Sequence, residues 1–172
     1  MEKGKSAHKL QISSKRANLL TTGLIARADQ DAQMEKIPSI KRYAPGDRLY
    51  VQAQQIWIIL VAFVMERDSD DRDSMTITYG ELAERMGYPD RRAGHTLSRQ
   101  LGIVGKYCKI NDIPTLNSIV VNKLTGEPGD DVVLRDGYSV RKEQNSVHRE
   151  NWFALRVPST GTFRKVWEDL NS

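Results

Sequence analysis

The sequence predicts an α+β fold built on a winged helix-turn-helix core, and three observations support this. A long apolar helix is followed by a short helix with its own start and stop signals. A cationic helix comes next, and the hydrophobic spacing then changes from helical steps to the alternation of a β-hairpin. This order of elements is typical of a winged helix, in which the hairpin forms the wing.

The composition predicts one domain preceded by a basic arm. Of the 172 residues, 39% are hydrophobic, and the net charge of +4 permits an anionic partner without requiring one. Residues 1–48 carry scattered apolar side chains and about twice as many basic as acidic ones. We therefore expect a partly flexible arm over 1–48 and a folded domain over 49–172.

Several classes of protein are excluded or disfavoured. The single cysteine, Cys108, excludes an internal disulfide, and the three histidines lie far apart, so we expect neither a metal site nor a cofactor. The longest apolar run, 56–65, is half of the roughly 20 residues that a membrane span needs. The first residues lack the apolar stretch of a secretory signal. We expect a cytoplasmic protein with no membrane partner.

Two helices are predicted before the cationic one. Apolar residues recur at helical spacing over 50–67, and the second half is apolar all round, so this helix should occupy the centre of the core. Thr78 and Glu81 have the spacing of a capping box at the start of a short helix over 79–86. Gly87 then ends that helix, and Pro89 prevents its continuation.

The third helix is predicted to begin near Asp90 and to run to Cys108. One apolar stripe supports it, formed by Ala93, Leu97, Leu101, Val104 and Cys108. Arg91, His95 and Arg99 are four residues apart and would point the same way. Such a cationic stripe suits phosphate binding, although an ordinary solvated helix face has the same pattern.

The period then changes to two. Residues 118–123 and 131–135 are predicted to be the strands of a hairpin, with turn residues between them. The last section is predicted to be a helical extension. It comprises a polar helical segment over 139–154 and a short terminal helix over 163–170.

The motifs of the short helix and of the segments after it resemble a known family. The segments 77–83 (Ile-Thr-Tyr-Gly-Glu-Leu-Ala), 87–89, 92–93, 113–114 and 120–121 are similar to the C-terminal winged-helix domain of the O6-alkylguanine DNA alkyltransferases and the alkyltransferase-like proteins. The similarity covers roughly 50–121. It implies that Tyr79 presses on a phosphate of the target nucleotide. It also implies that Arg92 enters the base stack where a base has been extruded.

The sequence departs from that family at its active site. The family's Pro-Cys-His-Arg tetrad is replaced by Pro-Thr-Leu-Asn over 114–117. Alkyl transfer needs an activated thiolate, so this activity is excluded. Cys108 lies on the apolar stripe and is expected to be a buried small hydrophobic residue.

The predicted function is therefore non-catalytic DNA binding, to duplex rather than single-stranded DNA. The residues expected to contact DNA are Tyr79, Arg91, Arg92, His95, Arg99, Lys106 and, from the wing, Lys123 and Arg135. Two alternatives remain open. One is a nuclease-like enzyme using Asp130, Asp131 and Glu143, although the expected lysine after Glu143 is missing. The other is a protein-interaction module in a bacterial or phage complex.

Overall fold

The computed structural model describes residues 39–66, 75–130 and 132–172. The chain divides into two units, 1–42 and 43–172, and every described helix and strand belongs to the second unit. Most of the predicted basic arm, residues 1–38, lies outside the described residues.

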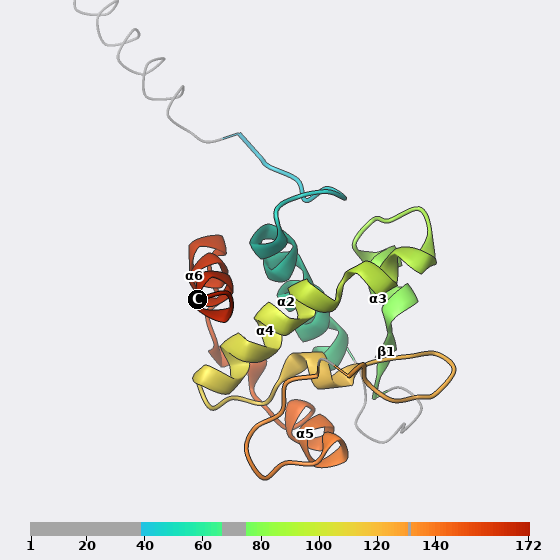
Figure 1. The fold of residues 1–172 in the computed structure, drawn as a ribbon, viewed down its shortest axis with the longest axis vertical. Helices are drawn as coiled ribbons and strands as arrows, with labels where there is room; N and C mark the ends of the chain where they lie inside the picture. Colours follow the sequence, from blue (N-terminus) through green and yellow to red (C-terminus); the bar gives the residue numbers. More distant parts are fainter. Residues whose placement is uncertain (1–38, 67–74, 131) are drawn as a thin grey trace, which may run out of the picture. The chain divides into compact units, whose positions relative to one another are not determined.

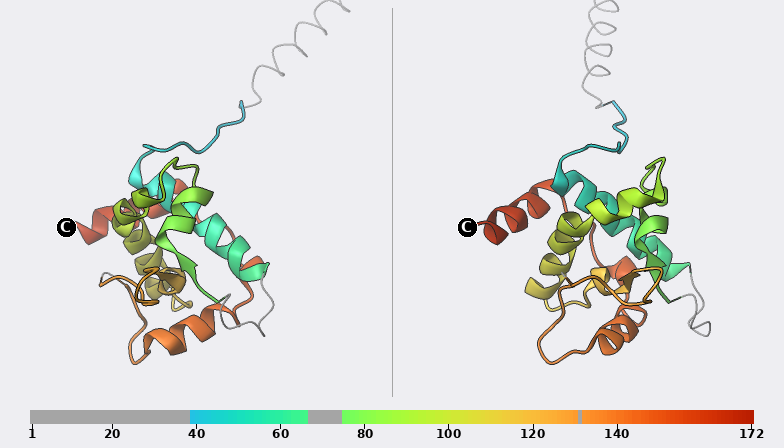
Figure 2. Two further views of the ribbon diagram at one scale, coloured as in Figure 1. Left: turned by 90° about the vertical axis from the view of Figure 1, so that its right-hand side faces the viewer. Right: turned by 45° about the vertical axis from the view of Figure 1, so that its right-hand side comes forward.

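The central element is helix α2, Leu49–Met65, within two residues of the range predicted from the apolar spacing. Ile56 and Leu60 are fully buried, and Trp57 and Phe63 are nearly so. The helix packs against α4 (Ser98–Ile110) and α6 (Thr160–Leu170), as Figures 1 and 2 show. Among the described residues, no helix combines the length and apolarity that crossing a membrane requires.

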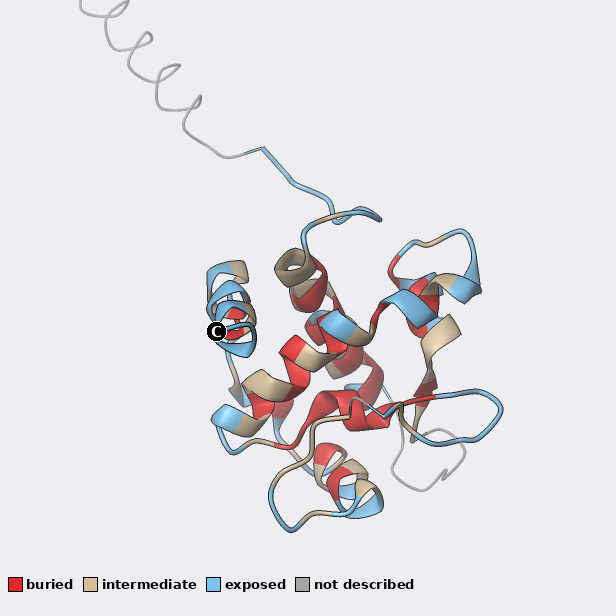
Figure 3. Ribbon diagram, in the orientation of Figure 1, coloured by how far each residue is buried: buried red, intermediate tan, exposed pale blue. Residues whose placement is uncertain are grey.

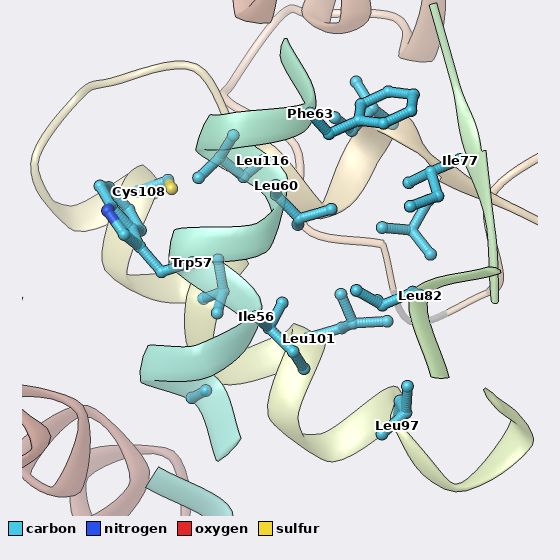
Figure 4. Close-up of a cluster of buried hydrophobic side chains, with 14 of the residues drawn as sticks. Ile56, Trp57, Leu60, Phe63, Ile77, Leu82, Leu97, Leu101, Cys108 and Leu116 are labelled. Atoms are coloured by element: carbon cyan, nitrogen blue, oxygen red, sulfur yellow. The ribbon is translucent and has the colours of Figure 1, made fainter. Parts of the chain in front are cut away.

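The hydrophobic core surrounds α2 and includes side chains from elements that follow it along the chain. Figure 4 shows α2 side chains meeting residues of α3 and α4 and the segment before β2, and the red interior in Figure 3 follows the same elements. Trp57 lies edge-on to the rings of Tyr107 and Trp152, with centroids 5.5 and 5.6 Å away. These contacts join α2, α4 and the C-terminal section in one core.

Helix α3, Tyr79–Arg85, confirms the predicted short helix and its capping box. The Thr78 hydroxyl accepts the backbone N–H of Glu81 at 3.2 Å, and the Glu81 carboxylate accepts the backbone N–H of Thr78 at 2.9 Å. Gly87 has a φ of +87°, a left-handed conformation that suits glycine and turns the chain out of the helix.

The third helix is shorter than predicted. Residues 91–96 form a 3₁₀ helix, η2 (Arg91–Thr96), and the α-helix α4 begins only at Ser98. Gly94 lies so close to α3 that a Cβ there would be 2.5 Å from the Tyr79 carbonyl oxygen, so tertiary contact favours the tighter turn. The predicted stripe of Arg91, His95 and Arg99 on one continuous α-helix is therefore wrong.

The predicted hairpin is also absent from the described residues. Strand β2 (Val120–Val121) forms inside the first predicted strand but pairs in parallel with β1 (Ile77–Thr78), Ile77 opposite Val120. The preceding residues form a 3₁₀ helix, η3 (Leu116–Ile119), and 132–135 form no strand. The fold is thus mainly helical with one small parallel sheet, which agrees with the α+β class.

The C-terminal section is largely helical, as expected. Ser139 caps helix α5 (Val140–Val147), which packs on η3. A short 3₁₀ helix, η4 (Trp152–Ala154), buries Trp152, whose indole N–H donates to the Val147 carbonyl at 2.8 Å. Helix α6 then covers α2 and α4, so this section completes the core.

Candidate nucleic-acid interface

A basic groove lies between the start of α3, η2 and the loop after β2. Its volume is about 270 Å³, and we define it by its lining residues, which are Thr78, Tyr79, Gly80, Arg91, Arg92, Gly94, His95, Asn122, Lys123 and Leu124. Five of the eight residues predicted to contact DNA thus gather here. They come from η2, from the start of α3 and from the loop after β2.

The cations of the groove are available to a ligand. Arg91 pairs with Glu84 and Arg92 with Asp90, the latter at 2.9 Å, but all four side chains are more than half exposed. Lys123 and His95 are exposed and make no ion pair with any described residue. Exposed ion pairs are weak, so a phosphate can replace the carboxylate partners of the arginines.

Asp90 organises the first turn of η2. Its carboxylate accepts both the backbone N–H and the Nε–H of Arg92, each at 2.9 Å. The backbone hydrogen bond, supported by the guanidinium, lowers the pKa of Asp90. The carboxylate therefore stays ionised near neutral pH and holds Arg92 at the edge of the groove, with its side chain 88% exposed.

A polar cavity of about 460 Å³ adjoins the basic groove. Tyr79, His95 and Asn122 line both spaces, and the cavity is completed by Ser98, Leu101, Asn117, Thr125, Pro128, Gly129, Asp130 and Val132. Its volume falls within the range of about 300–1,000 Å³ typical of ligand sites. A strand bound in the groove would thus lie next to a space large enough for a small polar group.

Tyr79 stands at the boundary between the two spaces. Its hydroxyl oxygen accepts the backbone N–H of Gly129 at 3.0 Å, which joins α3 to the loop after β2. A hydroxyl can accept and donate at once, and that of Tyr79 donates to no group in the described part of the chain. Its proton is free for an acceptor such as a phosphate oxygen.

Asn117 is the least expected member of the cavity lining. It is only 4% exposed, yet its Oδ1 has no hydrogen-bond partner among the described residues. Buried amide oxygens are normally paired, because leaving one unpaired costs free energy. Thr115 Oγ1 and Ser118 Oγ, on either side of Asn117, are buried and unpaired among the described residues in the same way.

Three predicted DNA contacts lie elsewhere. Arg99 and Lys106 are on α4 and line neither the groove nor the cavity. Arg135 lines neither space, and its Nε lies 3.0 Å from Glu143 Oε1, with the two side chains 14% and 0% exposed. Arg135 thus neutralises a buried carboxylate, and its contact with DNA stays a prediction.

The same ion pair removes one carboxylate from the nuclease-like alternative. Glu143 accepts from Arg135 and from the Thr115 backbone N–H, so it holds the chain together inside the protein. Asp131 lies outside the described residues. In the described part of the chain, no three His, Cys, Asp or Glu side chains are grouped to hold a metal ion.

Cys108 is fully buried on α4, as the sequence predicts. Burial raises the pKa of its thiol to about 12. A thiol of this kind is protonated at neutral pH and is not nucleophilic. It also lines neither the groove nor the cavity.

Asn117, Asn122 and Leu124 are among the lining residues that sequence reasoning did not predict. Only the resemblance gave a signal for Asn117, because it would place this residue opposite the arginine of the Pro-Cys-His-Arg tetrad. Asn122 and Leu124 gave no signal, since they were placed in a hairpin that does not form. No protein-family model, curated protein or solved structure matches the chain, so the resemblance to alkyltransferases stays a prediction.

Proposed function

We propose that the protein is a non-catalytic DNA-binding protein of winged-helix type, similar to the alkyltransferase-like proteins. The basic groove would follow the phosphate backbone of duplex DNA, and the polar cavity would receive one nucleotide extruded from the stack. In this proposal, η2 and α4 take the place of the recognition helix, and the loop after β2 takes the place of the wing.

The observation that carries the proposal is the shared wall of the groove and the cavity. Cations line the first space, and uncharged polar groups predominate in the second, with Tyr79 between them. Phosphates need cations, whereas a nucleobase needs hydrogen-bond partners in a shielded space. A nucleotide extruded beside the groove would meet both kinds of surface in the correct order.

The resemblance assigns roles that this geometry supports. Tyr79 has a free hydroxyl proton next to the groove, which fits a contact with a phosphate. Arg92 extends from η2 with an almost fully exposed side chain, which fits insertion into a base stack. Extrusion of a base costs a few kcal/mol, and an inserted side chain offsets part of that cost.

The test is a fluorescence-anisotropy titration of labelled duplex and single-stranded DNA at two salt concentrations. We expect tighter binding to duplex, and tighter still when the duplex has a mismatch, because an unpaired base is easier to extrude. Lys123→Ala should weaken binding several-fold. It should also make the fall of log K with log salt less steep, by about one in the magnitude of the slope. Arg92→Ala should also weaken binding.

The matched control is Lys165→Ala, which removes an exposed lysine from α6, an element that contributes nothing to the groove. Tyr79→Phe keeps the ring but removes the whole hydroxyl group, including the oxygen that accepts the Gly129 N–H. Equal losses from Lys123→Ala and Lys165→Ala would reject the groove as the binding surface. Absence of binding even at low salt would reject DNA binding altogether.

A further inference from the structure

One apolar side chain of the basic groove has no explanation in phosphate binding. Leu124 is 94% exposed, more than any other large hydrophobic residue in the described part of the chain. Single exposed leucines are common on protein surfaces. This one differs because it lines a groove whose other members include Arg91, Arg92 and Lys123.

The loop that carries Leu124 is held by its own hydrogen bonds. The Asn122 backbone N–H donates to the Glu127 carbonyl and the Gly126 N–H to the Asn122 carbonyl, both at 2.8 Å. The Leu124 N–H donates to the Asn122 side chain, also at 2.8 Å. Gly126 has a φ of +71°, which a glycine adopts without strain.

The loop is also attached to the body at its end. The Gly129 N–H donates to the Tyr79 hydroxyl, which fixes the loop to the start of α3. Leu124 is therefore carried by an ordered turn, and Figure 3 colours most of the segment after Val121 as exposed. Because the backbone of this loop is already ordered, binding through Leu124 need not order the loop as well.

We propose that Leu124 is an apolar wedge that enters the base stack of the duplex bound in the basic groove. Proteins that kink DNA insert leucine and similar side chains between base steps, next to cations that hold the backbone. Leu124 and Arg92 line the same groove, from the loop after β2 and from η2. The wedge would separate the step next to the polar cavity, which would receive the displaced base.

This inference rests on the proposed DNA binding, and the experiment is designed to separate the two. The probe is a short duplex with one central mismatch and the fluorescent adenine analogue aminopurine as the neighbouring base. Aminopurine becomes brighter when it is unstacked, so its emission reports the wedge, while the anisotropy of a second label reports binding. Both are recorded for the full-length protein.

Wild-type protein should raise the aminopurine emission several-fold. With Leu124→Ala, most of the rise in aminopurine emission should disappear. The affinity should fall about tenfold, as expected when one leucine side chain is no longer buried in the complex. This variant should keep the salt dependence of the wild type, because it removes no charge. Leu124→Met keeps an apolar side chain of similar reach and should restore most of the gain.

The matched control is Leu170→Ala, which makes the same chemical change at the end of α6. It should behave like the wild type in both signals. Binding without a rise in aminopurine emission, or an equal rise with Leu124→Ala, would overturn the wedge and leave DNA binding intact. No anisotropy change with any variant would overturn both proposals.

Discussion

The side chain of Asn117 lies directly against the α4 backbone at Gly105. A Cβ at Gly105 would be 2.5 Å from both the amide nitrogen and the amide oxygen of Asn117. A larger side chain therefore fits there only if the Asn117 side chain or one of the two elements moves. Gly105 thus leaves room for the Asn117 amide, which lines the polar cavity. As a glycine inside a helix, it also lowers the stability of α4.

This contact predicts opposite effects for two glycines of α4. Gly102→Ala adds a methyl group to open space and should raise the free energy of unfolding by up to about 1 kcal/mol. Gly105→Ala should lower it by about 1–3 kcal/mol, because the methyl group overlaps Asn117. Urea unfolding measures both. In an Asn117→Ala background the cost of Gly105→Ala should shrink, and equal stabilisation by both alanines would contradict the contact.

The ion pair of Arg135 and Glu143 predicts a large stability effect. Glu143→Ala leaves the Arg135 guanidinium and the Thr115 N–H without their acceptor, so it should cost about 3–5 kcal/mol in urea unfolding. Glu143→Gln keeps an acceptor for Thr115 and should cost less. As a control, Lys109→Ala breaks an exposed pair with Asp136 and should cause no measurable change. A small effect of Glu143→Ala would mean that the pair is not buried.

The capping box of α3 predicts a smaller effect. Thr78→Ala removes the acceptor for the Glu81 N–H and should cost about 1 kcal/mol of unfolding free energy, whereas Thr78→Ser keeps the hydroxyl and should cost little. Thermal unfolding followed by circular dichroism compares the two. Thr76→Ala, just outside the helix, is the control, and a loss equal to that of Thr78→Ala would argue against a capping role.

Burial of Cys108 predicts both its reactivity and a dependence of stability on pH. A thiol reagent should label the protein slowly at pH 8 and rapidly in denaturant, and Cys108→Ala gives the blank. The thiol keeps its proton in the folded state up to a pKa of about 12, whereas an unfolded thiol ionises near about 8.5. The stability of the wild type relative to Cys108→Ala should therefore fall as pH rises between these two values. Fast labelling of the native protein would show that the thiol is accessible.

Much of the helical structure was predictable because its signals are local. The apolar spacing of 50–67 and the capping box at Thr78 located α2 and α3 to within about two residues, since both depend on neighbours within one or two turns. Cys108 was placed in the core for the same reason. The basic groove was predicted only in part, because Arg91 and Arg92 are recognisable from charge, whereas Leu124 is not.

The errors have a common cause in contacts that are distant in sequence. The alternating pattern of 118–123 suggested a hairpin, but β1 pairs with β2 instead, and a pattern of side chains does not identify the partner strand. Arg135 resembled a surface cation, but its environment depends on Glu143 in another element. Periodicity along the chain identifies neither the partner of a strand nor the partner of a charged side chain.

The sequence by itself determined α2, α3 and the burial of Cys108. Only the tertiary structure decided that η2 tightens into a 3₁₀ helix beneath Tyr79, because Gly94 must approach the α3 backbone. It also decided that the groove and the cavity share a wall, because the Tyr79 hydroxyl accepts a hydrogen bond from Gly129, fifty residues away. Contacts of this range follow from the packing of the whole core, which no local pattern encodes.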